Sequence, residues 1–156
     1  MSDFKLAIPV ILQHEGGLVD NPDDPGGLTK YGISQRSYPG VDIRNLTVEQ
    51  ASLIYERDWW NPHYYGQIND QHVATKVFDM AVNMGTKRAH SIAQRSVNLV
   101  QDGIIGPKTI AAINAADPET LLNSMRALQA GYYNNIVIVN PALRQFLAGW
   151  LARARY

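Results

Sequence analysis

The chain has 156 residues, and its 14 basic and 14 acidic side chains give a formal net charge of zero. This length is sufficient for one domain with a buried core, and the balanced charge argues against a nucleic-acid partner. There is no cysteine to form a disulfide, and the histidines are scattered without the spacing of a metal site: His14, His63, His72 and His90. We therefore predict that the protein needs no cofactor and no metal.

The N-terminal residues, Met1–Lys5, lack the long apolar core of a secretory signal, and Pro9 interrupts the apolar residues that follow. No apolar run approaches the length of a membrane span. We therefore expect synthesis in the cytoplasm without a signal peptide.

The first predicted helix runs from a cap at Asp3 to about His14. Pro9 would remove one of its backbone hydrogen bonds, so we expect a bend there or a shorter regular helix. The apolar residues recur at helical spacing on one face: Phe4, Ala7, Ile8, Ile11 and Leu12.

Glu15 comes at the last turn of this helix, directly before Gly16 and Gly17. The C-terminal end of a helix carries partial negative charge, which disfavours a second negative charge at this position. Exclusion of water from a cleft would disfavour it further. A carboxylic acid that keeps its proton in this way is suited to act as a general acid.

The segment after Glu15 is rich in turn residues and predicts a tight loop with a small β-hairpin near Leu28–Ile33. Folded back, it would place a second carboxylate and the hydroxyl of Thr29 across a gap from Glu15. Two carboxyl groups, one protonated and one ionised, form the arrangement that hydrolyses glycosidic bonds. Three aspartates compete for the second position, and periodicity does not choose among them: Asp20, Asp23 and Asp24.

The capping-box pattern from Thr47 to Gln50 opens a second helix, which is predicted to reach about Trp59. An aromatic cluster follows at its end. Flat aromatic faces stack on sugar rings, but large aromatics after a helix also fill a core. We expect Trp59 to lie in the core, and both possibilities stay open for Trp60 and Tyr64.

A third predicted helix, over residues 71–84, is capped by Asp70 and ends at Gly85. Near its end Asn83 stands among apolar residues, where the helix should line a cleft. Its side chain could bind a sugar N-acetyl group or tie a backbone carbonyl to its neighbour. A fourth helix is expected over about residues 87–100.

The run Asp102–Thr109 predicts a tight loop that feeds a helix with Pro107 at its first position. Its glycines and polar side chains are expected to serve the loop backbone rather than a ligand. Two further helices, at about 118–136 and 141–154, each begin with a cap and a proline. The last of them should carry arginines on a solvated outer face: Arg144, Arg153 and Arg155.

The pattern E-G-G-x-x-x-N-P-x-D-x-G-G-x-T-x-x-G-I, which starts at Glu15, resembles the N-terminal signature of glycoside hydrolase family 108. Members of that family are phage endolysins and related bacterial muramidases. The resemblance continues at residues 78–85, 102–109 and 146–153, so it spans nearly the whole chain. The chain departs from the family pattern in the loop before Pro22. Relatives usually have Tyr after the two glycines, where this chain has Leu18, and Asn-Asp before the proline, where it has Asp20-Asn21.

The resemblance implies a role for each residue of the signature. Glu15 would be the proton donor, Asp24 the second carboxylate, and Thr29 a residue that helps to hold the attacking water. Candidates for substrate binding are Trp60, Tyr64, Asn83 and, within the signature, Tyr31.

Together these observations predict an α+β fold that is predominantly α-helical and lysozyme-like. We expect about seven helices and a small β-hairpin beside the active site. Neither an internal repeat nor a flexible linker is present, so we predict a single domain over residues 1–156. Its C-terminal part, from about residue 92, resembles a peptidoglycan-binding region.

The predicted function is that of an N-acetylmuramidase, which cleaves the β-1,4 bond between N-acetylmuramic acid and N-acetylglucosamine in peptidoglycan. The alternatives are a lytic transglycosylase, which acts on the same bond without water, and a non-catalytic wall-binding module. The expected partners are peptidoglycan glycan strands and a holin or a dedicated export system. We expect a monomer that acts on the cell wall in the periplasm.

Overall fold

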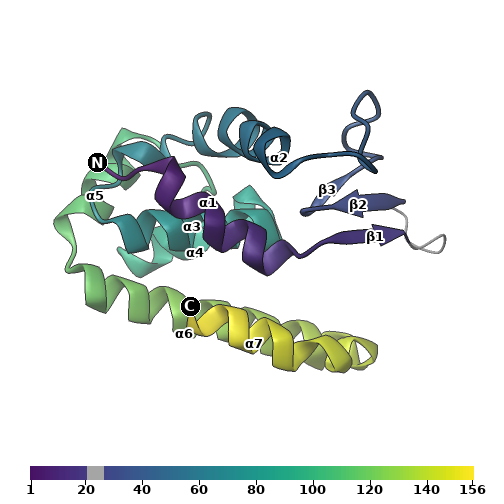
Figure 1. Cartoon of the computed structure of the whole chain (residues 1–156). Coiled ribbons are helices and arrows are strands. Elements are labelled where there is room, and N and C mark those ends of the chain that lie inside the picture. The colour runs from purple at the N-terminus through teal and green to yellow at the C-terminus, as the bar shows by residue number, and fades with distance from the viewer. Residues whose placement is uncertain (21–26) are drawn as a thin grey trace.

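Helix α1 (Phe4–Glu15) leads into a three-stranded sheet at one end of the molecule (Figure 1). The computed structural model describes residues 1–20 and 27–156. Within them, the rest of the regular structure is helical: α2 (Val48–Tyr55), η1 (Glu56–Trp60), η2 (Tyr65–Gln67), α3 (Gln71–Met84), α4 (Thr86–Ser96), α5 (Pro107–Ala115), α6 (Pro118–Val139), η3 (Pro141–Phe146) and α7 (Leu147–Arg155). The predicted α+β class, dominated by seven α-helices in the described part of the chain, is confirmed.

Helix α1 begins as predicted, because the Asp3 carboxylate accepts a hydrogen bond of 2.8 Å from the Lys5 amide. The regular helix is not shortened at Pro9, since it continues through this residue to Glu15. Pro9 lies on the exposed face, where water can satisfy the carbonyl that proline leaves without a donor.

The sheet has the order β1-β2-β3 and is antiparallel throughout, with strands Leu18–Asp20, Leu28–Lys30 and Ile33–Ser34. Strands β2 and β3 form the predicted hairpin, and β1 extends it. Only two residues, Tyr31 and Gly32, join β2 to β3, and both have positive φ (52° and 76°). This pattern is that of a type I′ turn, which favours glycine at its second position.

Helix α2 is capped as predicted by Thr47, but it passes into the π-helical turn η1 before it reaches Trp59. In that turn the amide of Asn61 bonds the carbonyl of Glu56, five residues earlier, at 3.0 Å. A π turn shifts the inward position by one residue. Trp60, only 4% exposed, therefore fills the core position expected for Trp59, which is partly exposed.

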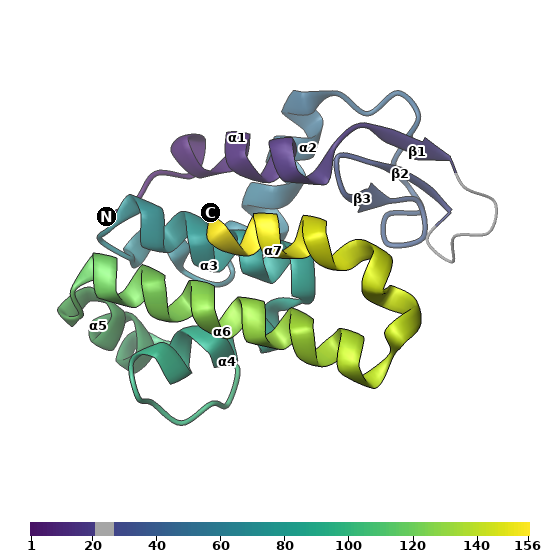
Figure 2. The same cartoon turned by 90° about the horizontal axis from the view of Figure 1, so that it is seen from below.

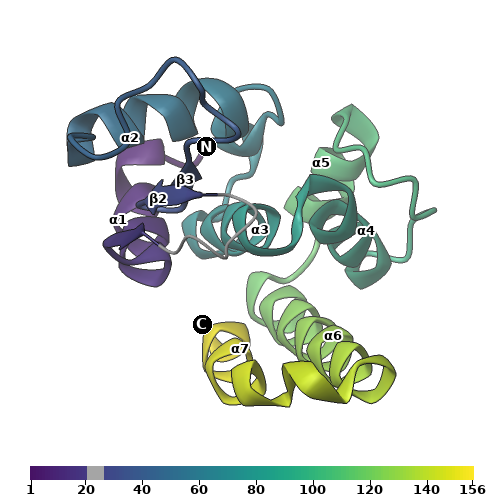
Figure 3. The same ribbon diagram turned by 90° about the vertical axis from the view of Figure 1, so that its right-hand side faces the viewer.

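Helix α3 is the centre of the molecule, and Figure 3 shows it between α1 and α4, with α6 and α7 below. Every residue from Val73 to Ala81 is buried. A helix buried on all sides has no solvated stripe for polar groups. The two charged residues inside it, Lys76 and Asp79, therefore need partners from other elements.

Helices α1 and α3 run in the same direction. Near their starts, Ser2 N donates to Ile68 O at 2.9 Å, and near their ends the His14 side chain is hydrogen-bonded to the Asp79 carboxylate. The C-terminal ends of both helices consequently lie towards the sheet.

Helix α4 is shorter than predicted and stops at Ser96 rather than near Val100. Asn98 takes a positive φ of 56°, and the Leu99 amide bonds back to the Gln94 carbonyl at 2.9 Å. Asparagine is one of the few residues besides glycine that ends a helix in this way.

The loop before α5 serves its own backbone, as predicted. The buried Gln94 side chain holds it by donating to Asp102 Oδ1 at 2.7 Å and accepting from the Gly103 amide at 2.9 Å.

The C-terminal quarter of the chain forms a helical hairpin in which α7 returns alongside α6 (Figure 2). The predicted last helix is interrupted, because Pro141–Phe146 is a 3₁₀ segment and the α-helix starts only at Leu147. Phe146, expected to face inward, is 48% exposed. Among the described residues, no helix is both long and apolar enough to span a membrane.

Candidate functional site

Glu15 ends α1 beside the β2–β3 turn. A Cβ atom built on Gly32 would lie 2.7 Å from Glu15 Oε2 and 2.5 Å from the Tyr55 hydroxyl. That hydroxyl donates to the Tyr31 carbonyl at 2.8 Å and so fixes the turn to α2. Only glycine fits at position 32, both for its positive φ and for this close approach to the carboxylate.

On its other side, Glu15 meets Arg153 from α7. The distance from Arg153 Nη2 to Glu15 Oε1 is 2.7 Å, and the two side chains are only 11% and 18% exposed. Oε1 is buried and finds no well-directed hydrogen bond, so the contact is an ion pair rather than an aligned donor–acceptor pair. The guanidinium thus places a positive charge beside Glu15, which was not predicted from the sequence.

Arg153 also binds Asp79, whose side chain is fully buried in α3. Its Nε and Nη2 atoms donate to the carboxylate at distances from 2.8 to 3.2 Å. Burial acts to raise the pKa of Asp79, but hydrogen bonds from His14 and Arg153 hold it below its ordinary value. Burial likewise acts to lower the pKa of Arg153, and Asp79 and Glu15 together raise it instead.

His14 completes this charged cluster. Its Nδ1 lies 2.9 Å from Asp79 Oδ1, and since an ionised carboxylate can only accept, Nδ1 carries the proton. The cluster thus joins α1, α3 and α7 through four side chains, with Glu15 at the edge nearest the sheet.

Of the remaining signature residues, Thr29 lies in the middle of β2, half-buried and paired with Val19 and Ser34. Tyr31 forms the turn itself, and its ring lies 5.5 Å from Lys30 Nζ. Asp24 and Asp23 fall outside the described residues. The third candidate, Asp20, ends β1 and forms an exposed ion pair of 2.8 Å with Arg44.

One predicted substrate contact needs correction. Trp60 is buried against Phe4 and Phe78, because the π turn η1 rotates it into the core, so it presents no face to a sugar. Tyr64 is exposed, and its contact with substrate stays a prediction.

Asn83 has a partner inside the protein. Its Oδ1 accepts a short hydrogen bond from the Tyr133 hydroxyl, which also accepts from Gln129 at 2.9 Å. Asn83 thus ties α3 to α6 through the Tyr133 side chain rather than through a backbone carbonyl, and its contact with a sugar stays a prediction.

Sequence reasoning missed Arg153 and Asp79. Arg153 was expected on a solvated face, whereas its charge is needed by the buried carboxylate. A signal for Asp79 existed, because a charged residue within the apolar run Phe78–Val82 requires a buried partner. No signal in the sequence identified that partner, which lies 74 residues away.

In the part of the chain that the structure describes, no group of three histidine, aspartate or glutamate side chains could hold a metal ion. The cluster around Glu15 provides a carboxyl group held beside a guanidinium.

Residues 8–85 match the family described as Glycosyl hydrolase 108, and residues 87–155 match a Predicted Peptidoglycan domain. No curated protein matches the sequence.

Among solved structures, SagA of Brucella abortus is similar, with 29% identity and a TM-score of 0.80 over 97% of this chain and 88% of that one. The first matched segment contains Glu15, Thr29 and Asp79, and the second contains Arg153. The chain is a lysozyme-like hydrolase that acts on peptidoglycan, and it belongs to the Glycosyl hydrolase 108 family.

Proposed function

We propose that the protein is an N-acetylmuramidase that cleaves the β-1,4 bond between N-acetylmuramic acid and N-acetylglucosamine, with Glu15 as proton donor. The observation that carries this proposal is the position of Glu15 in a chain of this family. Its carboxyl group is only 18% exposed, ion-paired at 2.7 Å to Arg153 and backed by Gly32. Such a sheltered and fixed carboxyl group is what transfer of a proton to a leaving oxygen requires.

Arg153 has a positioning role in this scheme. Its guanidinium stays bound to Asp79 by hydrogen bonds from Nε and Nη2, whichever protonation state Glu15 has. It therefore offers Glu15 a fixed partner through the reaction cycle.

Asp24 is proposed as the second carboxylate, which activates water together with Thr29 and stabilises the oxocarbenium-like transition state. The order Glu15, Asp24, Thr29 is similar to the Glu-Asp-Thr order of phage-type lysozymes, and by this similarity we propose inversion at the anomeric carbon. Inversion requires carboxyl groups about 6.5–9.5 Å apart, enough for a water molecule between them. Proton NMR of the first-formed anomer would distinguish inversion from retention.

Because peptidoglycan lies outside the cytoplasmic membrane, we propose that the protein acts in the periplasm as a monomer. A holin or a dedicated export system would bring it there.

The test is mass spectrometry of the muropeptides released from purified sacculi by the wild type and by Glu15→Gln. We expect products with reducing N-acetylmuramic acid ends from the wild type and a loss of at least about 100-fold in the variant. Glu49→Gln is the matched control, since Glu49 is exposed at the start of α2. Circular dichroism of each variant checks that the fold is retained.

Two other results would assign a different function. Anhydro ends would identify a lytic transglycosylase and leave Asp24 without its proposed role. Sacculi that bind the protein but release nothing would identify a wall-binding module.

A further inference from the structure

A groove runs between α4 and α6, away from Glu15. It consists of two adjoining hollows of about 480 and 360 Å³ that share Arg88, Ser91 and Tyr132. We call it the α4–α6 groove. Its lining includes Met84, Gly85, Lys87, Arg88, Arg95 and Tyr132.

All charged side chains that line this groove are positive. It contains Lys87, Arg88 and Arg95, but no aspartate or glutamate, although the chain as a whole has equal numbers of both charges. Among the described residues, no carboxylate lies within ion-pair distance of these three side chains. The positive charge of the groove thus has no carboxylate partner inside the described part of the molecule.

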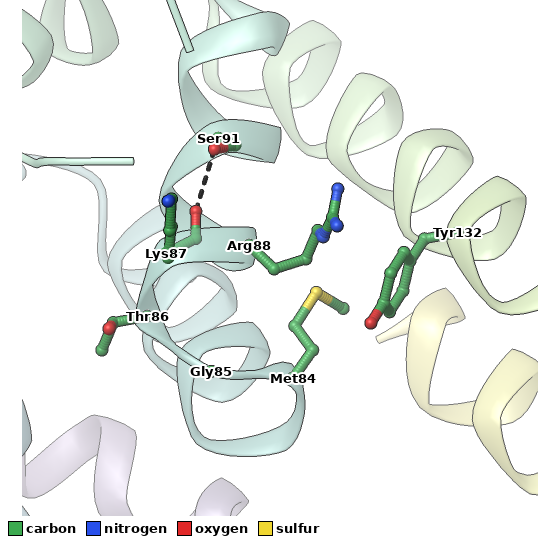
Figure 4. Close-up of a pocket in the computed structure, with 7 residues that line it drawn as sticks. All are labelled: Met84, Gly85, Thr86, Lys87, Arg88, Ser91 and Tyr132. Carbon is green, nitrogen blue, oxygen red and sulfur yellow. Dashed lines mark hydrogen bonds between the residues drawn. The ribbon is translucent and has the colours of Figure 1, made fainter. Parts of the chain in front are cut away.

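One of these cations is held in place. The guanidinium carbon of Arg88 lies 5.1 Å from the centre of the Tyr132 ring, a cation–π contact across the two helices. Figure 4 shows Arg88 reaching towards Tyr132, with the Met84 side chain beside them. The contact leaves the N–H groups at the edge of the guanidinium available to bind a carboxylate.

The groove is also continuous with the helix that carries the charged cluster. It starts at Met84 and Gly85, at the end of α3, only about 8 Å along the helix axis beyond Asp79. Because α1 and α3 run in the same direction, this end of α3 lies towards the sheet, as Glu15 does. A ligand that extends from Glu15 past the end of α3 would meet the groove.

We propose that the α4–α6 groove binds the carboxylates of the peptide that peptidoglycan carries on the lactyl group of muramic acid. This assignment rests on the proposed function, in which the glycan strand lies at Glu15. The peptide branches from the strand and bears free carboxylates, whereas N-acetylglucosamine is uncharged. Arginine side chains recognise carboxylates through paired, charge-assisted hydrogen bonds, so Arg88 and Arg95 are the residues expected to select the peptide.

The test measures binding in the full-length Glu15→Gln protein, so that no turnover interferes. Isothermal titration calorimetry compares disaccharide–tetrapeptide fragments from sacculi with the same fragments after their carboxyl groups are converted to amides. For Arg88→Gln/Arg95→Gln we expect the dissociation constant of the native fragment to rise about tenfold. Amidation should weaken binding to the parent by a similar factor and change binding to this double variant little.

Two further variants make the test specific. Arg88→Lys/Arg95→Lys keeps both charges and should retain most of the affinity. Lys5→Gln/Arg144→Gln removes two exposed charges outside the groove and should bind as the parent does.

The proposal is overturned if amidation leaves the affinity of the parent unchanged, or if the glutamine double variant binds the native fragment as the parent does. Arginine-dependent binding of a phosphate polymer such as teichoic acid, without preference for the native fragment, would also overturn it. Because binding is read without cleavage, failure of the muramidase proposal in the muropeptide experiment is recognised separately.

Discussion

Gly32 determines how closely the β2–β3 turn approaches the proposed proton donor. Its φ is +76°, and an added Cβ atom would lie 2.7 Å from Glu15 Oε2 and 2.5 Å from the Tyr55 hydroxyl. Neither neighbour can move freely, because Glu15 is ion-paired to Arg153 and Tyr55 is bonded to the turn. Position 32 therefore couples the shape of the turn to the position of the carboxyl group.

We predict that Gly32→Ala destabilises the protein by about 2 kcal/mol, through the strained φ alone, and lowers kcat on sacculi by at least about tenfold. The matched control is Gly40→Ala, because Gly40 has no positive φ and no atom within 4 Å of its added Cβ. Urea unfolding and the rate of muropeptide release measure the two effects. A Gly32→Ala protein as active as Gly40→Ala would mean that the turn does not position Glu15.

Among the contacts between elements, the hydrogen bonds of His90 join α4 to η2 and to the loop before α5. Its Nδ1 lies 3.0 Å from the Gly103 carbonyl, so Nδ1 carries a proton and Nε2 accepts from the Tyr65 hydroxyl at 2.7 Å. The side chain is 2% exposed, and burial lowers the pKa of His90 from 6.5 to about 4. A neutral imidazole is thus part of the folded structure.

This depressed pKa predicts that stability falls on acidification. Between pH 6.5 and about 4 the unfolded chain binds a proton that folded His90 does not, so unfolding becomes easier as the pH falls through this window. The loss attributable to His90 reaches about 3 kcal/mol, and it is absent above pH 6.5.

Urea unfolding at pH 7 and pH 4.5 measures the loss. His90→Asn should be less stable than the wild type at pH 7 but lose less stability on acidification, whereas the exposed control His72→Asn should follow the wild type. Equal losses in His90→Asn and the wild type would show that other groups cause the acid sensitivity.

The sequence predicts the elements whose signals are local. Asp3, Thr47 and Asp70 cap helices as expected, because a cap and its partner amide lie within three residues of each other. Trp59 was expected in the core and is partly exposed, whereas Trp60, left open, is buried, since the π turn that shifts their phase is not encoded in the spacing of apolar residues.

The candidate site was predicted only as far as it is contiguous in sequence. Glu15 and Thr29 lie in one short signature, whereas Arg153 reaches the site by folding of a distant helix. Its partner Asp79 becomes buried only when α1, α4, α6 and α7 surround α3. Such long-range pairing has no local signal.

At the scale of the whole molecule, the last residues of the chain bind the core of its N-terminal half. Arg153 binds Glu15 and Asp79, and the buried Lys76 amine of α3 donates to the Ala154 carbonyl at 2.8 Å. The Tyr156 ring lies edge-on to His14 at 5.4 Å. The two segments matched by separate family models are therefore joined by buried polar contacts.

These contacts predict that the two segments unfold together, as the single domain expected from the sequence. In hydrogen-exchange mass spectrometry under increasing urea, peptides from α3 and from α6 should become exchangeable at the same midpoint. Arg153→Met leaves Asp79 buried without its guanidinium, which should cost about 3 kcal/mol and lower both midpoints equally. The neighbouring control Arg155→Met, at an exposed position, should change neither. If Arg153→Met lowered protection in α6 and α7 alone, the C-terminal segment would be a separate unit, and its contact with Glu15 would be a docking contact rather than part of one cooperative core.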